Sequence, residues 1–140
     1  MKKVSWKIHT KTNPEGIFKL LTTDEGRCKY WAETSVEIDG EIDFSFYGGL
    51  KTSCRVLDTT PFSRFAIKYF NTLVTIFLEE SPEGGTELTL ICEDIPEENY
   101  SEMYADWVSV LLALKAYADF KVDIRNHHPN KTWKQGYCDV

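Results

Sequence analysis

The 140-residue sequence contains no long run of apolar residues. A helix that crosses a bilayer needs about 20 of them in a row, and a secretory signal needs a shorter apolar segment behind a basic start. Neither pattern is present, although Lys2 and Lys3 follow the first methionine. We therefore expect a cytoplasmic protein without membrane insertion.

Metal-binding patterns are also missing. The four cysteines form no C-x-x-C pair, which argues against a zinc knuckle and a thioredoxin-like site and favours reduced thiols. His127 and His128 lie near Cys138, but adjacent histidines are poorly placed to share one ion. We expect no metal site and no cofactor.

The sequence lacks the common catalytic motifs as well. It has no G-x-S-x-G elbow, no H-E-x-x-H helix and no glycine-rich phosphate loop, since its glycine pairs fall where hairpins need turns. Most carboxylates alternate outward or lie in loops, so no acid/base pair and no catalytic residue is predicted. An enzyme stays an open alternative if Tyr47, Tyr69 or Tyr104 faces a bound molecule.

Basic residues are the minority, with 16 Lys and Arg against 22 acidic residues and a net charge of -6. Such a field repels phosphate backbones, and no basic stripe is interleaved with aromatics, so nucleic acid is not an expected partner. The simplest interpretation of the acidic runs, such as Glu79-Glu80 and Glu97-Glu98, is a solvated rim. An acidic edge that steers a basic partner protein is the alternative.

Aromatic side chains, by contrast, are abundant at 14%. A chain of this length forms one domain and buries about 68% of the surface that its unfolded form exposes. We therefore expect a single domain over residues 1–140, in which the aromatics fill a core or surround an apolar pocket.

The N-terminal part shows a strand and two short helices. Alternation from Val4 to Ile8 predicts a half-buried strand. An N-cap asparagine, a proline and an acid follow one another at residues 13–15 and start a helix that ends near Leu21. Thr23 caps a second short helical turn that ends near Cys28.

Residues 33–92 show strand patterns separated by turn signals such as Asp39-Gly40 and Gly84-Gly85. Six strands here and the first strand predict a seven-stranded antiparallel sheet with one wet face, on which Glu37 is expected. The expected inward residues are Val36 and Ile38; Ile42, Phe44 and Phe46; Cys54 and Val56; Phe65, Ile67 and Tyr69; Val74, Ile76 and Leu78; Leu88, Leu90 and Cys92.

A long helix follows, for which Asn99 and Glu102 predict a capping box and which runs to about Lys121. Its apolar face is wider than a plain stripe. Core packing explains such a face, and the alternative is that part of it borders a hollow with Trp107 as an aromatic wall. The face comprises Met103, Trp107, Val110, Leu111, Leu114, Tyr117 and Ala118, widened by Tyr104, Val108 and Leu112.

Residues 122–140 form a C-terminal extension beyond this helix. The stretch is not low in complexity, and Trp133 and Tyr137 would be costly to expose. We expect it to pack back on the domain.

This order of elements is similar to the α+β helix-grip fold of the START-like (SRPBCC, Bet v 1-like) superfamily. Within it the chain resembles the bacterial relatives of the activator of heat-shock protein 90 ATPase, C-terminal domain type, over residues 4 to about 121. The stretches that carry the resemblance are residues 13–18 (NPEGIF), residues 20–26 (LLTTDEG) with Trp31, residues 44–49 (FSFYGG), residues 60–65 (TPFSRF), residues 85–90 (GTELTL) and residues 107–117.

The resemblance implies a hydrophobic cavity under the long helix and no fixed chemistry. Members of the superfamily bind lipids, sterols, polyketides or plant hormones, and some are cyclases. No universal catalytic motif can be carried over. The extension after Val122 goes past the usual end of the family domain, where it would cap one mouth of the cavity.

A small apolar or amphipathic molecule is therefore the main expected partner. The alternatives are a cyclase- or hydrolase-like enzyme that uses the same cavity and a co-chaperone that acts on a heat-shock protein 90-type chaperone. Eukaryotic relatives combine this domain with an N-terminal chaperone-docking domain, which these 140 residues do not include. A START-like edge strand would allow a weak homodimer, and a monomer fits the sequence equally well.

The ligand-binding residues are predicted from their shared inward phase under the helix. The Tyr69 hydroxyl is expected to orient the polar end of the ligand. The predicted lining is Trp31, Phe44, Phe46, Phe65, Tyr69, Ile76, Leu90, Trp107, Leu111 and Leu114.

Overall fold

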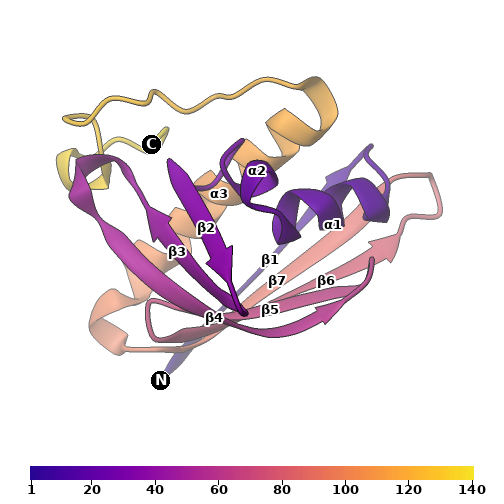
Figure 1. Cartoon of the computed structure of the whole chain (residues 1–140), viewed down its shortest axis with the longest axis horizontal. Helices are drawn as coiled ribbons and strands as arrows, with labels where there is room; N and C mark the ends of the chain where they lie inside the picture. The colour runs from indigo at the N-terminus through magenta and orange to yellow at the C-terminus, as the bar shows by residue number, and fades with distance from the viewer.

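A seven-stranded antiparallel sheet forms the frame of the computed structural model, which describes residues 1–140 (Figure 1). The strand order across the sheet is β1-β7-β6-β5-β4-β3-β2, so that β1 and β2 are the two edges. Register shifts in β1 and β4 help the sheet to curve. The strands are β1 (Lys2–Thr10), β2 (Thr34–Ile38), β3 (Glu41–Ser45), β4 (Lys51–Thr60), β5 (Arg64–Tyr69), β6 (Thr72–Glu80) and β7 (Thr86–Ile95).

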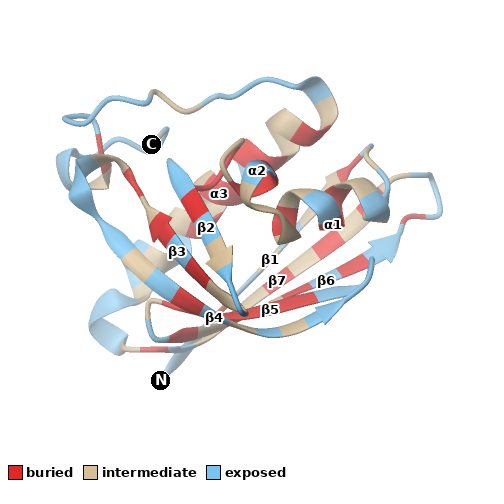
Figure 2. Ribbon diagram, in the orientation of Figure 1, coloured by how far each residue is buried: buried red, intermediate tan, exposed pale blue.

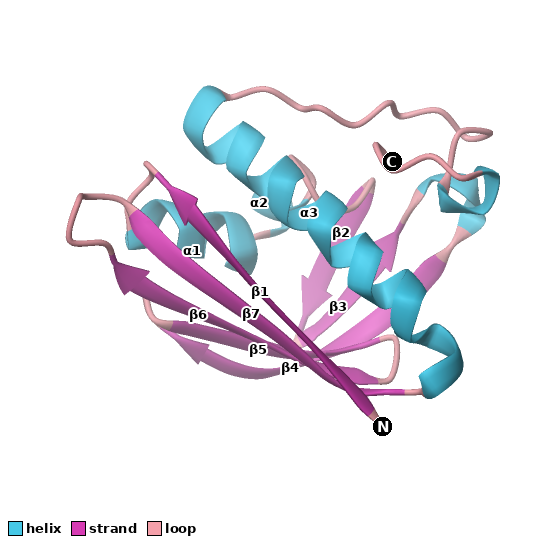
Figure 3. Ribbon diagram, turned by 180° about the vertical axis from the view of Figure 1, so that it is seen from behind, coloured by secondary structure: helices cyan, strands magenta, loops and turns pink.

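One long helix, α3 (Tyr100–Phe120), crosses the sheet diagonally and packs along β1 (Figure 3). Two short helices, α1 (Pro14–Thr22) and α2 (Asp24–Arg27), follow the first strand. Their predicted N-caps are confirmed, because the Gly16 amide donates to the Asn13 side chain at 2.8 Å and the Gly26 amide donates to Thr23 Oγ1 at 3.0 Å. The α+β helix-grip architecture predicted from the sequence is confirmed.

The core lies between the sheet and the helices (Figure 2). The inward phases predicted for β3, β5, β6 and β7 are confirmed, and both strand cysteines, Cys54 and Cys92, are fully buried. Val56 is only half-buried. No helix has the length and apolarity that crossing a membrane requires.

The phase predicted for β2 is wrong. Val36 and Ile38 are 51% and 67% exposed, whereas Ser35 is buried and Glu37 is half-buried on the inner side. The cause is the buried guanidinium of Arg27, which hydrogen-bonds to Ser35 and Glu37. A buried cation needs polar partners, so β2 turns its polar side chains inward and its apolar ones outward.

The capping box predicted at the start of α3 is also wrong. A 3-10 turn, η2 (Glu97–Asn99), leads directly into the helix and gives Asn99 φ -103° and ψ 0°. A capping side chain needs the extended backbone that this turn removes. Asn99 therefore makes no side-chain cap, and it lies at the rim of the pocket described below.

Residues 122–140 return from the end of α3 toward the β3–β4 turn (Figures 1 and 3). Arg125 joins this extension to the domain, since its guanidinium donates to the carbonyls of Ala32 at 3.0 Å and Cys28 at 2.8 Å. Farther on, a 3-10 turn, η3 (Trp133–Gln135), brings the Trp133 ring to 6.5 Å from that of Phe46. Tyr137, by contrast, is 42% exposed.

Candidate functional site

A pocket of about 240 Å³ lies beside the N-terminal half of α3. Five separate parts of the chain meet there: the helix itself, the β3–β4 turn, the β5–β6 turn, the loop that follows β7, and the C-terminal extension. Most of the lining is apolar or aromatic. The lining residues are Leu50, Tyr69, Phe70, Thr72, Pro96, Asn99, Glu102, Met103, Asp106, Trp107, Val110 and Trp133.

The inner wall of the pocket is a cluster of aromatic rings. The Tyr69 ring lies 5.3 Å from that of Trp107 and 4.8 Å from that of Phe70. The Trp31 indole donates to the Tyr69 hydroxyl at 3.2 Å, which fixes the tyrosine. Burial raises the pKa of Tyr69 far above its usual range, so the hydroxyl keeps its proton.

Phe70 holds a strained place in this wall. Tyr69 and Thr72 pair across a two-residue turn in which Phe70 has φ 47° and Asn71 has φ 62°. Such turns favour asparagine and glycine, and a bulky side chain in the left-handed region costs about 1–3 kcal/mol. Asn71 suits its position and Phe70 does not. The residue with the strained backbone thus places its phenyl ring in the pocket wall.

Two carboxylates of α3, Glu102 and Asp106, supply the charge in the lining. Glu102 is exposed at the rim, whereas Asp106 is partly buried. Burial and, as the smaller cause, the nearby Glu102 carboxylate together raise the pKa of Asp106 to about 7. Neither takes part in an ion pair within the chain.

Two indole N–H groups of the lining also lack partners. The Nε1 atoms of Trp107 and Trp133 are buried and form no hydrogen bond. Trp107 lies near enough to Cys92 to moderate the rise in the pKa of that thiol, which burial causes. The Nε1 atom of Trp133 is left without an acceptor. A buried donor without an acceptor is costly, so an acceptor from outside the chain would be favourable here.

The ten residues predicted to bind a ligand are all buried, and the structure separates them into two groups. Tyr69 and Trp107 line the pocket. The other eight lie behind the pocket wall or deeper in the core, where the Trp31 ring is 4.9 Å from that of Phe44 and 5.9 Å from that of Trp107. Ligand binding by the ten stays a prediction. The interior beneath the middle of α3 is filled with side chains, and the pocket lies nearer the start of the helix.

The inward phase alone did not identify the rest of the lining. Phe70 sits in a turn, where no strand phase applies, and Trp133 lies far along the chain in the extension. Met103 and Val110 belong to the predicted apolar face of the helix, so their place could have been found from it. Of the tyrosines considered for an enzyme, Tyr69 lines the pocket, whereas Tyr47 contacts His127 and Tyr104 packs on Trp6.

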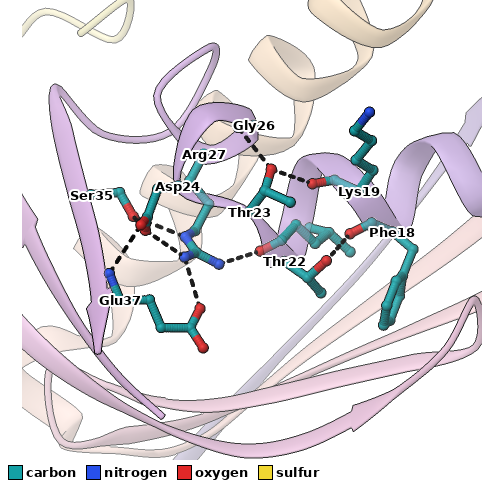
Figure 4. A network of polar contacts seen from close by, with 10 residues as sticks. Phe18, Lys19, Thr22, Thr23, Asp24, Gly26, Arg27, Ser35 and Glu37 are labelled. Atoms are coloured by element: carbon teal, nitrogen blue, oxygen red, sulfur yellow. Dashed lines mark hydrogen bonds and ion pairs between the residues drawn. The ribbon is translucent and has the colours of Figure 1, made fainter. Parts of the chain in front are cut away.

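A second polar cluster, formed around Arg27, lies away from the pocket (Figure 4). The buried guanidinium donates to Ser35 Oγ at 2.9 Å, to the Leu21 carbonyl at 3.0 Å, to Asp24 at 2.8 Å and to Glu37 at 3.0 Å. Burial alone would raise the pKa of Asp24, but hydrogen bonds from the Glu37 amide, Arg27 and Ser35 outweigh it and lower that pKa. This network is closed, and it ties α2 to β2.

Comparisons with known proteins place this architecture. A family model described as Activator of Hsp90 ATPase homolog 1-like protein matches residues 11–119. Comparison with curated proteins found no match. Among solved structures, a protein from Staphylococcus saprophyticus has a TM-score of 0.77 at 22% identity, covering 89% of this chain and 96% of that chain.

Two further solved structures are similar over nearly their whole length. The Aha1 dimer from Colwellia psychrerythraea has a TM-score of 0.76 at 23% identity, covering 86% of this chain and 98% of that chain. An AHSA1-like protein from Aeromonas hydrophila has a TM-score of 0.76 at 14% identity, covering 91% of this chain and 98% of that chain. At these identities the likeness shows the fold.

Proposed function

The chain belongs to the Activator of Hsp90 ATPase homolog 1-like family, as its sequence indicated, and from this premise we propose that it binds a small amphipathic molecule in the pocket beside α3. The observation that carries the proposal is the pocket itself, an apolar hollow with a few polar groups at one side. Pockets of this composition are the usual sites of small-molecule binding.

The size of the pocket limits the ligand. Sites for drug-sized ligands span roughly 300–1,000 Å³, and this pocket is about 240 Å³. It therefore suits a small molecule or the apolar end of a larger one. The aromatic wall, which includes Trp133, would hold the apolar part, while Asp106 would meet the polar part.

The strain at Phe70 supports the same proposal. A turn with glycine or asparagine at this position would hold β5 and β6 together without the left-handed strain. Phe70 instead adds an aromatic surface to the pocket. Strained backbone is common at binding sites, where a side chain is held for recognition rather than for stability.

The test is an NMR titration of the full chain with phenylbutanol, a neutral amphipathic probe. We expect chemical shifts to change at the lining residues, Phe70 and Val110 among them, and to saturate. Leu50→Trp at the mouth of the pocket should weaken binding at least tenfold. The matched control is Leu57→Trp, because Leu57 is likewise exposed and lies outside the lining.

Two results would overturn the proposal. One is the absence of saturable shift changes for phenylbutanol and for its amine and acid analogues. The other is a set of shift changes that maps away from the pocket or that Leu50→Trp and Leu57→Trp reduce equally. Native mass spectrometry of the gently purified protein complements the titration, since a bound molecule from the host would appear as added mass that denaturation removes.

A second candidate function is contact with a heat-shock protein 90-type chaperone, as the family description suggests. The edge strand β2 favours it, because Val36 and Ile38 stand exposed beside an unpaired strand edge. The same edge would also serve a homodimer. Val36→Lys should abolish capture by a purified bacterial chaperone of this type, and no capture by the unaltered protein would exclude the candidate.

A further inference from the structure

All the charged side chains of the pocket lining are acidic. The lining includes Glu102 and Asp106 but no lysine, arginine or histidine. The two carboxylates are four residues apart on α3, so they lie one helical turn from each other, where like charges destabilise a helix. A positive charge placed between them would remove that repulsion.

The chain itself does not supply this charge. Asp119, a partly buried carboxylate near the other end of α3, accepts hydrogen bonds from the Lys11 and Thr12 amides at 2.9 and 3.1 Å, whereas Asp106 accepts none. Lys115, a basic residue of α3, donates to the His9 carbonyl. Burial and the Glu102 charge both raise the pKa of Asp106, and no hydrogen bond to its carboxylate lowers it.

The aromatic wall is an independent feature that favours the same kind of ligand. Tyr69, Phe70, Trp107 and Trp133 all contribute to the lining. The faces of aromatic rings attract cations, most strongly where water is excluded. Aromatic rings beside unpaired carboxylates are a common arrangement for binding organic ammonium groups, whereas an anion at this place would meet two negative charges.

We propose that the ligand of this pocket is an amphipathic cation, an organic ammonium with an apolar body, whose charged nitrogen is bound by Asp106 and Glu102 and whose body packs on the aromatic wall. The inference rests on the proposed function of the pocket. It adds the chemical class of the ligand and assigns Asp106 as the residue that selects it.

The test compares three probes that share one apolar body: phenylbutylamine, phenylbutanol and phenylbutyrate. Each is titrated into the full chain near pH 8 and followed by NMR. We expect the amine to bind at least tenfold more tightly than the alcohol, and the acid to bind most weakly. If the alcohol binds as tightly as the amine, the pocket is a binding site but the inference is wrong. If none of the three binds, the proposed function itself fails.

Asp106→Asn separates the role of this carboxylate from general attraction to an acidic protein. We expect the preference for amine over alcohol to fall by about tenfold in this variant. Glu98→Gln is the matched control, since it removes one negative charge from a nearby exposed residue outside the lining. An equal fall in both variants would overturn the assignment of Asp106.

The pH dependence gives a second readout. Besides Asp106, the titratable groups in the lining are Glu102 on α3 and Tyr69 on β5, while the β3–β4 turn, the β7–α3 loop and the extension contribute none. Asp106 ionises through a pKa of about 7, and alkylamines stay charged throughout this range. The preference for amine over alcohol should therefore grow between about pH 5.5 and pH 8.5. A preference that is constant over this range would contradict the inference.

Discussion

Arg27 and Asp106 are the centres of two polar clusters that differ in completeness. Arg27 is buried, and its guanidinium is bound by two carboxylates, a hydroxyl and a carbonyl, all from the chain itself. Asp106 is partly buried and has a second carboxylate as its charged neighbour. The first cluster is complete without a ligand. The second contains no cation from the chain, and its two carboxylates line the pocket.

The pKa values of Asp24 and Asp106 shift in opposite directions, because only Asp24 has hydrogen-bond donors that oppose the effect of burial. At Asp24, burial raises the pKa but the Glu37 amide and Arg27 overcome it, so the pKa is lowered. At Asp106, burial meets no opposing hydrogen bond, and the pKa rises to about 7. Similar carboxylates thus serve structure in one cluster and, in our proposal, recognition in the other.

The largest expected effect follows from removing the centre of the complete cluster. Arg27→Met leaves Ser35 and the Leu21 carbonyl without their donor and the carboxylates of Asp24 and Glu37 without their cation. Breaking a buried ion pair by removing one partner costs about 3–5 kcal/mol, so the free energy of unfolding should fall by this amount. Urea denaturation near pH 7 measures it.

The same substitution at an exposed ion pair is the control. Arg55 pairs with Glu41 at 3.0 Å, with side chains 59% and 45% exposed. Arg55→Met should cost less than about 1 kcal/mol. Equal losses in the two variants would show that the cluster around Arg27 is no more important to stability than a surface pair.

An intermediate effect of opposite sign is expected at Asp106. The pKa is about 7 in the folded chain and near its ordinary value of 3.8 when unfolded, so the carboxyl destabilises the fold increasingly as pH rises through this interval. Asp106→Asn should therefore raise the free energy of unfolding by about 1 kcal/mol near pH 8 and leave it almost unchanged near pH 4. Denaturation at both pH values tests this.

Asp24→Asn provides the contrast, because the pKa of Asp24 is lowered in the folded state. Its carboxylate stabilises the fold above the unfolded pKa, and this contribution is lost as pH falls through the folded pKa. The variant should be less stable near pH 8. The comparison between the clusters would be refuted if both variants changed stability in the same direction there.

The smallest expected effect on stability comes from adding a cation to the cluster around Asp106 by substitution. Met103 lines the pocket three residues before Asp106, so Met103→Lys places a cation at i,i+3 spacing from the Asp106 carboxylate. Ion pairs at this spacing contribute about 0.2–0.5 kcal/mol, and stability should change little. The pKa of Asp106, followed by NMR of its carboxyl carbon, should fall below about 7.

Leu112→Lys is the control for this variant, because Leu112 lies on the same helix with its side chain 51% exposed and outside the pocket. It should leave the pKa of Asp106 unchanged. Met103→Lys should also abolish binding of phenylbutylamine. An unchanged pKa in both variants would mean that position 103 does not reach the Asp106 carboxyl.

Most of the fold could be predicted because local signals agreed with tertiary packing. Alternation fixed the inner faces of β5, β6 and β7, and the N-caps at Asn13 and Thr23 depend on contacts within a few residues. The phase of β2 could not be predicted, because it depends on Arg27, which becomes buried only when α2 packs against the sheet. Alternation of apolar residues cannot detect a buried cation.

The site was less predictable than the fold. Of the ten predicted residues, Tyr69 and Trp107 line the pocket, the first predicted from the inward phase of its strand and the second from the apolar face of the helix. The inward phase of a strand does not distinguish residues that pack against one another from residues that border a void. Phe44 and Leu90, which lie in the core, were therefore included in the predicted lining. Asp106 has no signal in the sequence either, because its raised pKa comes from burial beside Glu102, which only the packing around the pocket produces.

The wall that Trp133 contributes lies outside the span that defines the family, which ends at residue 119. Relatives that share the sheet and the helix need not share this wall. Under the proposed function, changes in the extension would alter ligand preference while the sheet and α3 stay intact, much as antibodies vary loops on a constant frame. Diversity of ligands within such a family would then be encoded in some twenty residues that a family model does not describe.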